Sequence, residues 1–168
     1  LSSTVVRPDC RRWHAVAAMY NCLMVDSICS SGSWPAISMR VYYEDTDAAG
    51  IVYYANYLRF LERGRTELLR TLGHDQNVLM KEGIAFAVRS VNAEFLKPAR
   101  LDDLLTVETT IAAMGRAQAT FAQRILRGSE LLLDAKIRVA CIDPARGKPM
   151  PMPRTIHEQL SALPGPSQ

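Results

Sequence analysis

Acidic residues and a glycine gather in one short segment, residues 45–50, whose composition is that of a turn. A carboxylate placed there can attack a carbonyl carbon or act as a general base toward water. A helix is predicted to begin just after this turn, and the first N–H groups of a helix have no partner within it. The amides of Tyr53, Tyr54 and Ala55 could therefore stabilise the oxyanion formed when a carbonyl is attacked.

Asp47 is the preferred carboxylate of three that lie close together. Strand alternation cannot direct Glu44, Asp45 and Asp47 into one site, so we expect one or two of them to be solvated or paired with Arg40. The competing interpretation of Asp47 is structural, because aspartate commonly caps a helix or an Asx-turn.

One long helix is predicted to follow the turn, from Tyr54 to Leu72. Its inward face is formed by residues at spacings of 4, 3, 4 and 4, namely Tyr57, Leu61, Gly64, Leu68 and Leu72. Glycine weakens a helix, so Gly64 predicts a close approach of a neighbouring backbone. The charged residues Glu62, Arg65 and Glu67 are interpreted as structural ion pairs at a subunit interface.

Strand patterns surround this helix. Residues 39–43 predict a strand before the turn, and a short helical piece at 75–82 precedes four further strands at 85–96, 105–113, 117–127 and 131–141. Gly115 and Gly128 are predicted to form hairpin turns between the last three strands. Short connections make neighbouring strands antiparallel, and one helix covers one face of a sheet. The predicted fold class is α+β, a curved antiparallel sheet wrapped around one long central helix, with an extended tail and a closing helical turn at 155–160.

The composition favours one ordinary domain. The chain has 168 residues, of which 48% are hydrophobic and 22% charged, and its net charge of +3 is too small to predict a nucleic-acid partner. Residues 38–162 are expected to form the domain, 163–168 a tail, and 1–37 a weakly structured extension or an over-long gene product. No apolar run is long enough for a membrane span. The four cysteines lack zinc-ligand or disulfide-framework spacing, which favours reduced thiols, a cytoplasmic location and no metal.

A family resemblance adds to this interpretation. Residues 40–57 closely resemble the active-site signature of the hotdog-fold acyl-CoA thioesterases, in the 4-hydroxybenzoyl-CoA thioesterase superfamily. The match is to the YbgC-like branch, which is associated with the Tol–Pal envelope system. Similarity continues through residues 60–67, 97–103, 141–144 and 148–149, so it covers roughly 39–160.

The resemblance implies a hotdog fold and roles for three residues. It implies that Asp47 is the catalytic nucleophile or general base, that Gly50 shapes the loop, and that the backbone N–H of Tyr54 polarises the thioester carbonyl. Many YbgC-like members carry a histidine where this chain has Tyr54, so no mechanism that needs that imidazole is predicted. The family also implies homodimers or homotetramers, with each site built by two chains and no cofactor, since coenzyme A is part of the substrate.

Several other residues are candidates for binding the substrate. Tyr53 and Tyr57, with Phe60, are placed along an acyl pocket, although aromatic residues on a helix more often belong to the core. The phosphates of coenzyme A would be met by cations near the sheet rim, and the candidates are Lys97, Arg100, Arg116, Arg124 and Arg127. Arg116 is the first of these to test.

Two other functions remain open at this point. The first is a non-catalytic hotdog module that binds acyl-CoA, acyl carrier protein or an envelope-associated partner. The second is a hotdog dehydratase, which is less favoured because those enzymes use a histidine and a helix acid in an arrangement absent here. Asp47-dependent release of a thiol would separate hydrolysis from binding.

Overall fold

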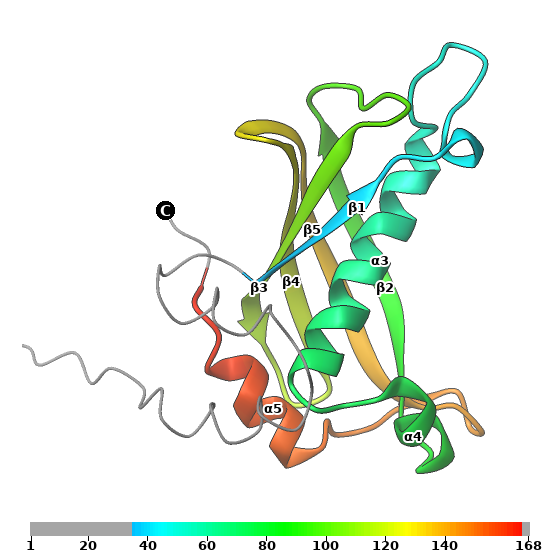
Figure 1. Cartoon of the computed structure of the whole chain (residues 1–168). Helices are drawn as coiled ribbons and strands as arrows, with labels where there is room; N and C mark the ends of the chain where they lie inside the picture. The colour runs from blue at the N-terminus through cyan, green and yellow to red at the C-terminus, as the bar shows by residue number, and fades with distance from the viewer. Residues whose placement is uncertain (1–34, 166–168) are drawn as a thin grey trace, which may run out of the picture. The chain divides into compact units, whose positions relative to one another are not determined.

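An antiparallel sheet curls around one long helix in residues 35–165, the part of the chain that the computed structural model describes (Figure 1). Most of the predicted extension and the last three residues of the predicted tail lie outside the described residues. The strands are β1 (Ala36–Arg40), β2 (Ala85–Phe95), β3 (Leu104–Met114), β4 (Gln118–Arg127), β5 (Glu130–Asp143) and the short β6 (Lys148–Pro149). The helices are α3 (Tyr54–Thr71), α4 (Gln76–Lys81) and α5 (Arg154–Ser161). The predicted α+β class is confirmed.

The strand order corrects one expectation. The sheet runs β1-β3-β4-β5-β2, with β6 beside β5. Strands β3, β4 and β5 form the predicted meander, with turns at Gly115 and Gly128, but β2 does not pair with its successor β3. It pairs with β5 instead, from Ala85 opposite Ile142 to Phe95 opposite Leu133. The eight-residue connection 96–103 is long enough to carry the chain from β2 at one edge of the sheet, past β5 and β4, to β3.

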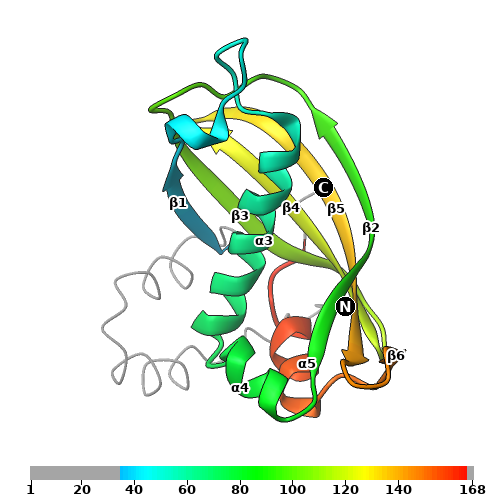
Figure 2. The same ribbon diagram turned by 90° about the vertical axis from the view of Figure 1, so that its right-hand side faces the viewer.

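Helix α3 lies in the concave face of the sheet, as Figure 2 shows. Its predicted inward face is confirmed, since Tyr57, Leu61, Gly64, Leu68 and Leu72 are all buried. A Cβ atom on Gly64 would lie 2.8 Å from Val107 Cγ1 and 2.9 Å from Thr109 Oγ1, both on β3. The sheet does approach closely at this glycine, as predicted, but the nearest atoms belong to side chains of β3 and not to a neighbouring backbone.

A buried amide joins the same helix to the sheet. Gln123 of β4 is fully buried, and its Nε2 donates to the Leu61 carbonyl at 2.9 Å and to Thr109 Oγ1 at 2.9 Å. The small residue at Gly64 leaves the space in which these bonds form.

The segment before the Asp47 turn differs from its prediction. The strand covers Ala36–Arg40 rather than 39–43, so it begins inside the range assigned to the extension. Tyr43–Asp45 form a 3-10 turn, because the Asp45 carboxylate accepts the Tyr42 N–H at 2.9 Å and the Asp45 N–H returns to the Tyr42 carbonyl at 3.0 Å. These local bonds compete with the strand ladder.

The C-terminal part closes one end of the core. The proline-rich tail is extended as predicted, and α5 is longer than the single turn expected. Ile156 and Leu160 on α5 are buried, and so is Met152 just before it. None of the described helices is long and apolar enough to cross a membrane.

Candidate active site

Asp47 lies in a turn that its own hydrogen bonds hold. Its Oδ1 accepts the Ala49 N–H at 2.8 Å, which is the Asx-turn of the competing structural interpretation. The Gly50 N–H donates to the Asp47 carbonyl at 2.9 Å, and the Asp47 N–H donates to the Ile51 carbonyl at 2.9 Å. Gly50 has φ of +71°, a conformation that favours glycine. The carboxylate is thus fixed and exposed, with Oδ2 directed to no described partner.

The start of α3 presents two open backbone donors. The Tyr53 N–H is taken by the Asp45 carbonyl at 2.9 Å, so this amide cannot serve as an oxyanion donor while that bond is made. Within residues 35–165, no acceptor takes the N–H of Tyr54 or of Ala55. Two of the three amides predicted as donors are therefore available.

The two other acidic residues near Asp47 lie outside the candidate site. Asp45 is buried and holds the 3-10 turn through its side chain, while its carbonyl also accepts from Asn56 Nδ2 at 3.0 Å. Glu44 is exposed. Arg40 was one expected partner for these carboxylates, but it forms no ion pair with Glu44 or Asp45 in residues 35–165. Its Nη1 donates instead to the Asp102 carbonyl at 2.6 Å. Asp47 alone of the three is both exposed and placed in the glycine turn.

The connection 96–103 passes beside this turn. The Val52 N–H donates to the Ala99 carbonyl at 2.9 Å, and Ile51 forms an antiparallel bridge with Arg100. The structure therefore brings Arg100 next to the candidate site. Tyr57 is buried, and its hydroxyl accepts the Ala99 N–H at 2.8 Å. This predicted pocket residue belongs to the core and anchors the connection.

Replacing Tyr57 with phenylalanine is expected to destabilise the fold by about 1–3 kcal/mol, because the Ala99 N–H would remain buried without an acceptor. Urea unfolding measures this change. Tyr43→Phe is the matched control, since its side chain is 83% exposed and should have no measurable effect. Equal stability of the two variants would contradict the anchoring contact.

Aromatic rings collect beside the open amides. The rings of Tyr53 and Tyr54 lie 4.6 Å apart between centroids, and Tyr54 meets Phe95 of β2 edge-on at 6.5 Å. Tyr57 contacts the same Phe95 ring at 5.6 Å. Tyr53, Tyr54 and Phe95 all remain substantially exposed. They form an apolar surface next to the helix start.

Most of the predicted phosphate-binding cations have carboxylate partners. Lys97 pairs with Glu130 at 2.7 Å, and Arg127 pairs with Asp103 at 2.7 Å and with Glu130 at 2.6 Å. The hydrogen bonds from Lys97 and Arg127 lower the pKa of the Glu130 carboxyl. Arg124 pairs with Glu108 at 2.7 Å. A ligand phosphate would have to displace these carboxylates.

Arg116 lies at the other end of the sheet. It is exposed in the turn between β3 and β4, and its carbonyl accepts the Met152 N–H at 2.9 Å, close to the start of α5. Since α3 begins at the opposite end, beside the connection 96–103, one chain does not bring Arg116 near Asp47 (Figures 1 and 2). On α3, Glu67 forms an ion pair with Arg70 of the same helix. The predicted ion pairs of Glu62, Arg65 and Glu67 at a subunit interface stay a prediction.

The family follows from sequence and structure together. A model of the thioesterase-like superfamily matches residues 41–160. This chain belongs to that superfamily. It is 47% identical over 124 residues to the acyl-CoA thioester hydrolase YbgC of Escherichia coli O6:H1, covering 73% of this chain and 90% of the relative. It is 45% identical over 119 residues to the acyl-CoA thioesterase YbgC of Haemophilus influenzae, covering 70% of this chain and 88% of the relative.

A solved structure gives the same result. The probable thioesterase from Bartonella henselae is 40% identical, with a TM-score of 0.69, and the match covers 72% of this chain and 100% of that one. The predicted hotdog fold and the resemblance to the YbgC-like branch are confirmed. The prediction of a thioester hydrolase is confirmed at the level of the family.

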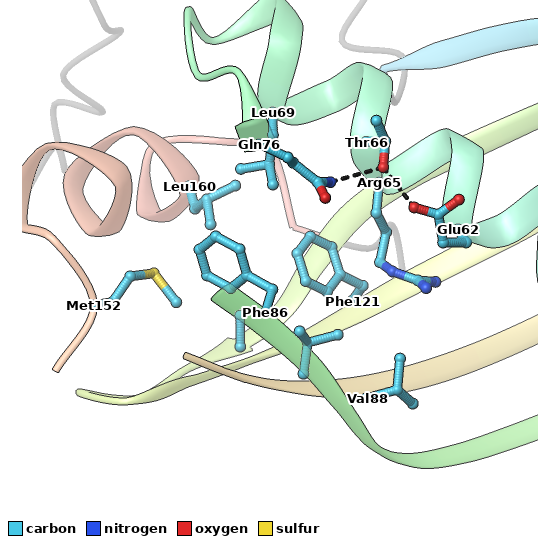
Figure 3. Close-up of a pocket in the computed structure, with 12 residues that line it drawn as sticks. Glu62, Arg65, Thr66, Leu69, Gln76, Phe86, Val88, Phe121, Met152 and Leu160 are labelled. Atoms are coloured by element: carbon cyan, nitrogen blue, oxygen red, sulfur yellow. Dashed lines mark hydrogen bonds between the residues drawn. The ribbon is translucent and has the colours of Figure 1, made fainter. Parts of the chain in front are cut away.

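A pocket on the far half of α3 was not predicted. It lies between α3, β2, β4 and the α5 region, and it contains the charged side chains of Glu62 and Arg65 among apolar ones (Figure 3). The sequence did contain one indication of a polar feature here. Gln123 stands at an inward position of β4 between buried Phe121 and Ile125, where an apolar residue is expected.

Proposed function

We propose that this chain hydrolyses acyl-CoA thioesters to a free acid and coenzyme A, with Asp47 as its catalytic carboxylate. The observation that carries the proposal is the placement of an exposed, fixed carboxylate in the glycine turn that leads into α3, whose Tyr54 and Ala55 amides are open. Relatives named as acyl-CoA thioesterases support the substrate class.

The proposed chemistry needs no group beyond the protein and water. The thioester carbonyl oxygen accepts from the amides at the start of α3, which stabilises the negative charge that develops on it. The Asp47 carboxylate either attacks the carbonyl carbon or removes a proton from an attacking water. The carbon–sulfur bond then breaks, and coenzyme A leaves as a thiolate that takes up a proton. If water attacked, the free acid forms in this same step. If Asp47 attacked, water then hydrolyses the acyl–Asp47 anhydride, which releases the free acid and restores the carboxylate. We propose no metal or redox cofactor.

The test is release of free thiol from a panel of acyl-CoA substrates, comparing wild type with Asp47→Asn. Aliphatic chains of increasing length and aromatic acyl groups should be included, since the exposed Tyr53, Tyr54 and Phe95 rings suit either class. Binding of acyl-CoA without Asp47-dependent thiol release would replace hydrolysis with a binding function. A cytoplasmic location stays a prediction.

We also propose that the working unit is at least a homodimer formed through β2. This strand lies at an edge of the sheet, and the inward side chains of Val88, Val91 and Phe95 are 43–51% exposed. Antiparallel pairing of two β2 strands about a two-fold axis between Val91 and Asn92 would set Arg89 opposite the partner's Glu94. Such a pairing would give hydrogen-bond partners to the unpaired backbone groups of the edge strand, and it would place opposite charges next to each other.

Val91→Asp is expected to convert the dimer into a monomer, because it buries a carboxylate in the proposed interface. Light scattering after size-exclusion chromatography measures the mass. Val78→Asp on α4 is the matched control, because Val78 is similarly exposed but lies away from β2. A dimer that survives Val91→Asp would contradict this interface.

A further inference from the structure

The pocket on the far half of α3 is apolar apart from a few side chains at one wall. Its volume is about 90 Å³. Most of its lining is apolar and includes Phe86, Ala119 and Phe121. Arg65 reaches into it from α3 toward the strands, beside Phe121 (Figure 3).

The Arg65 guanidinium is oriented but largely unsatisfied. Its Nη1 donates to Gln123 Oε1 at 2.7 Å, and Gln123 is itself held by Leu61 and Thr109. A guanidinium has five N–H donors, and no other acceptor for Arg65 is found in residues 35–165. Burial lowers the pKa of Arg65, and the negative charge of Glu62 opposes part of that change.

The nearest carboxylate is engaged elsewhere. Glu62 Oε1 accepts from Thr66 Oγ1 at 2.6 Å, and Thr66 Oγ1 accepts from Gln76 Nε2 at 2.7 Å. This chain of bonds holds Glu62 along the helix (Figure 3), and Glu62 forms no ion pair with Arg65. A partly buried guanidinium without a direct ion-pair partner raises the free energy of the protein. Binding of an anion to Arg65 would therefore be favourable.

We propose that this pocket binds a small carboxylic acid as its anion, with the carboxylate on Arg65 and the apolar body between Phe86 and Phe121. A planar guanidinium matches a carboxylate through two parallel hydrogen bonds. A volume of 90 Å³ holds roughly three to six non-hydrogen atoms, which suits an acid such as butyrate.

The site is separate from the proposed thioester site. Arg65 follows Tyr54 by eleven residues, which is about 16 Å along an α-helix. A short acyl group held at the start of α3 does not span that distance. Acid binding here therefore stands or falls independently of hydrolysis by Asp47.

Calorimetric titration of the full chain with butyrate tests the proposal, and butyramide is the neutral probe of the same size. We expect butyrate to bind with a Kd of about 1 mM and butyramide at least 10-fold more weakly. Arg65→Met should weaken butyrate binding by about 10-fold or more, and Arg65→Lys by less. Glu62→Gln should strengthen it, because a like charge on the pocket wall is removed. Arg63→Met, an exposed arginine of the same helix, is the matched control and should change nothing.

NMR of methyl groups locates the ligand. Butyrate should shift the Ala119 methyl in the pocket and leave the Ala48 and Ala49 methyls of the Asp47 turn unchanged. Asp47→Asn should still bind butyrate, so loss of hydrolysis and loss of acid binding are distinguishable. Absence of butyrate binding, equal binding of butyramide, or binding that survives Arg65→Met in a folded protein would overturn the proposal.

Discussion

Asp47→Asn is expected to lower kcat for thioester hydrolysis by about 10²–10⁴-fold, the range typical of removing a general base. Asparagine keeps a side-chain oxygen that can accept the Ala49 N–H, so the turn should persist. What is lost is the negative charge that attacks the carbonyl or activates water. Substrate affinity should change little, because the open amides of Tyr54 and Ala55 are untouched. Steady-state and single-turnover thiol release measure the effect.

The neighbouring acid supplies the control for this experiment. Glu44 is exposed and three residues away, so Glu44→Gln removes the same charge from almost the same place in the chain. Its activity should stay within about 2-fold of wild type, since the group lies outside the glycine turn. Full activity of Asp47→Asn, or an equal loss in Glu44→Gln, would remove Asp47 from the catalytic role.

Gly64→Val is expected to destabilise the protein by about 3 kcal/mol, at the upper end of the cost of overpacking a core. The new Cβ alone would lie 2.8 Å from Val107 Cγ1 and 2.9 Å from Thr109 Oγ1. Both neighbours are β-branched and stiff, so the helix must move away from the sheet. That movement stretches the bonds from Gln123 to Leu61 and Thr109. Thermal unfolding should show a melting temperature lower by about 10 °C.

Two further variants separate this clash from helix propensity. Arg59→Val places the same side chain on the exposed face of α3 and should cost about 0.5 kcal/mol. Gly64→Ala should fall between the two, because alanine gains about 1 kcal/mol of helix propensity that offsets part of its clash. If the Gly64→Val protein were as stable as the Arg59→Val protein, the close contact of Gly64 with Val107 and Thr109 would be contradicted.

Local patterns predicted the fold well where neighbours in sequence are neighbours in space. The spacing of apolar residues identified α3 and its buried face, and Gly115 and Gly128 identified the hairpins of the meander. The position of β2 was not predictable in this way, because its partner β5 follows more than thirty residues later. The end of β1 was also missed, since the bonds between Asp45 and Tyr42 end the strand at Arg40, earlier than its β-forming residues indicate.

The candidate site also was predictable only where its residues are close together in the sequence. Asp47, Gly50 and Tyr54 lie within one turn and the helix that follows, so a local pattern could place them together. The cations come from distant strands, and their charge alone does not tell which end of the sheet they reach. Arg116 therefore lies away from Asp47, whereas Arg100 is brought beside it by the connection 96–103. The Arg65 pocket was missed because it depends on Gln123, 58 residues further along the chain.

The turn around Asp47 is closed entirely by bonds among its own backbone atoms and one carboxylate oxygen. Ala48 and Ala49 are exposed at its tip, and neither side chain helps to hold it. Substitutions at these two positions should therefore cost the fold little, within about 0.5 kcal/mol, while changing what a substrate meets beside the reactive carboxylate. Ala48 and Ala49 are thus positions at which natural or engineered substitutions can change substrate selectivity without destabilising the fold.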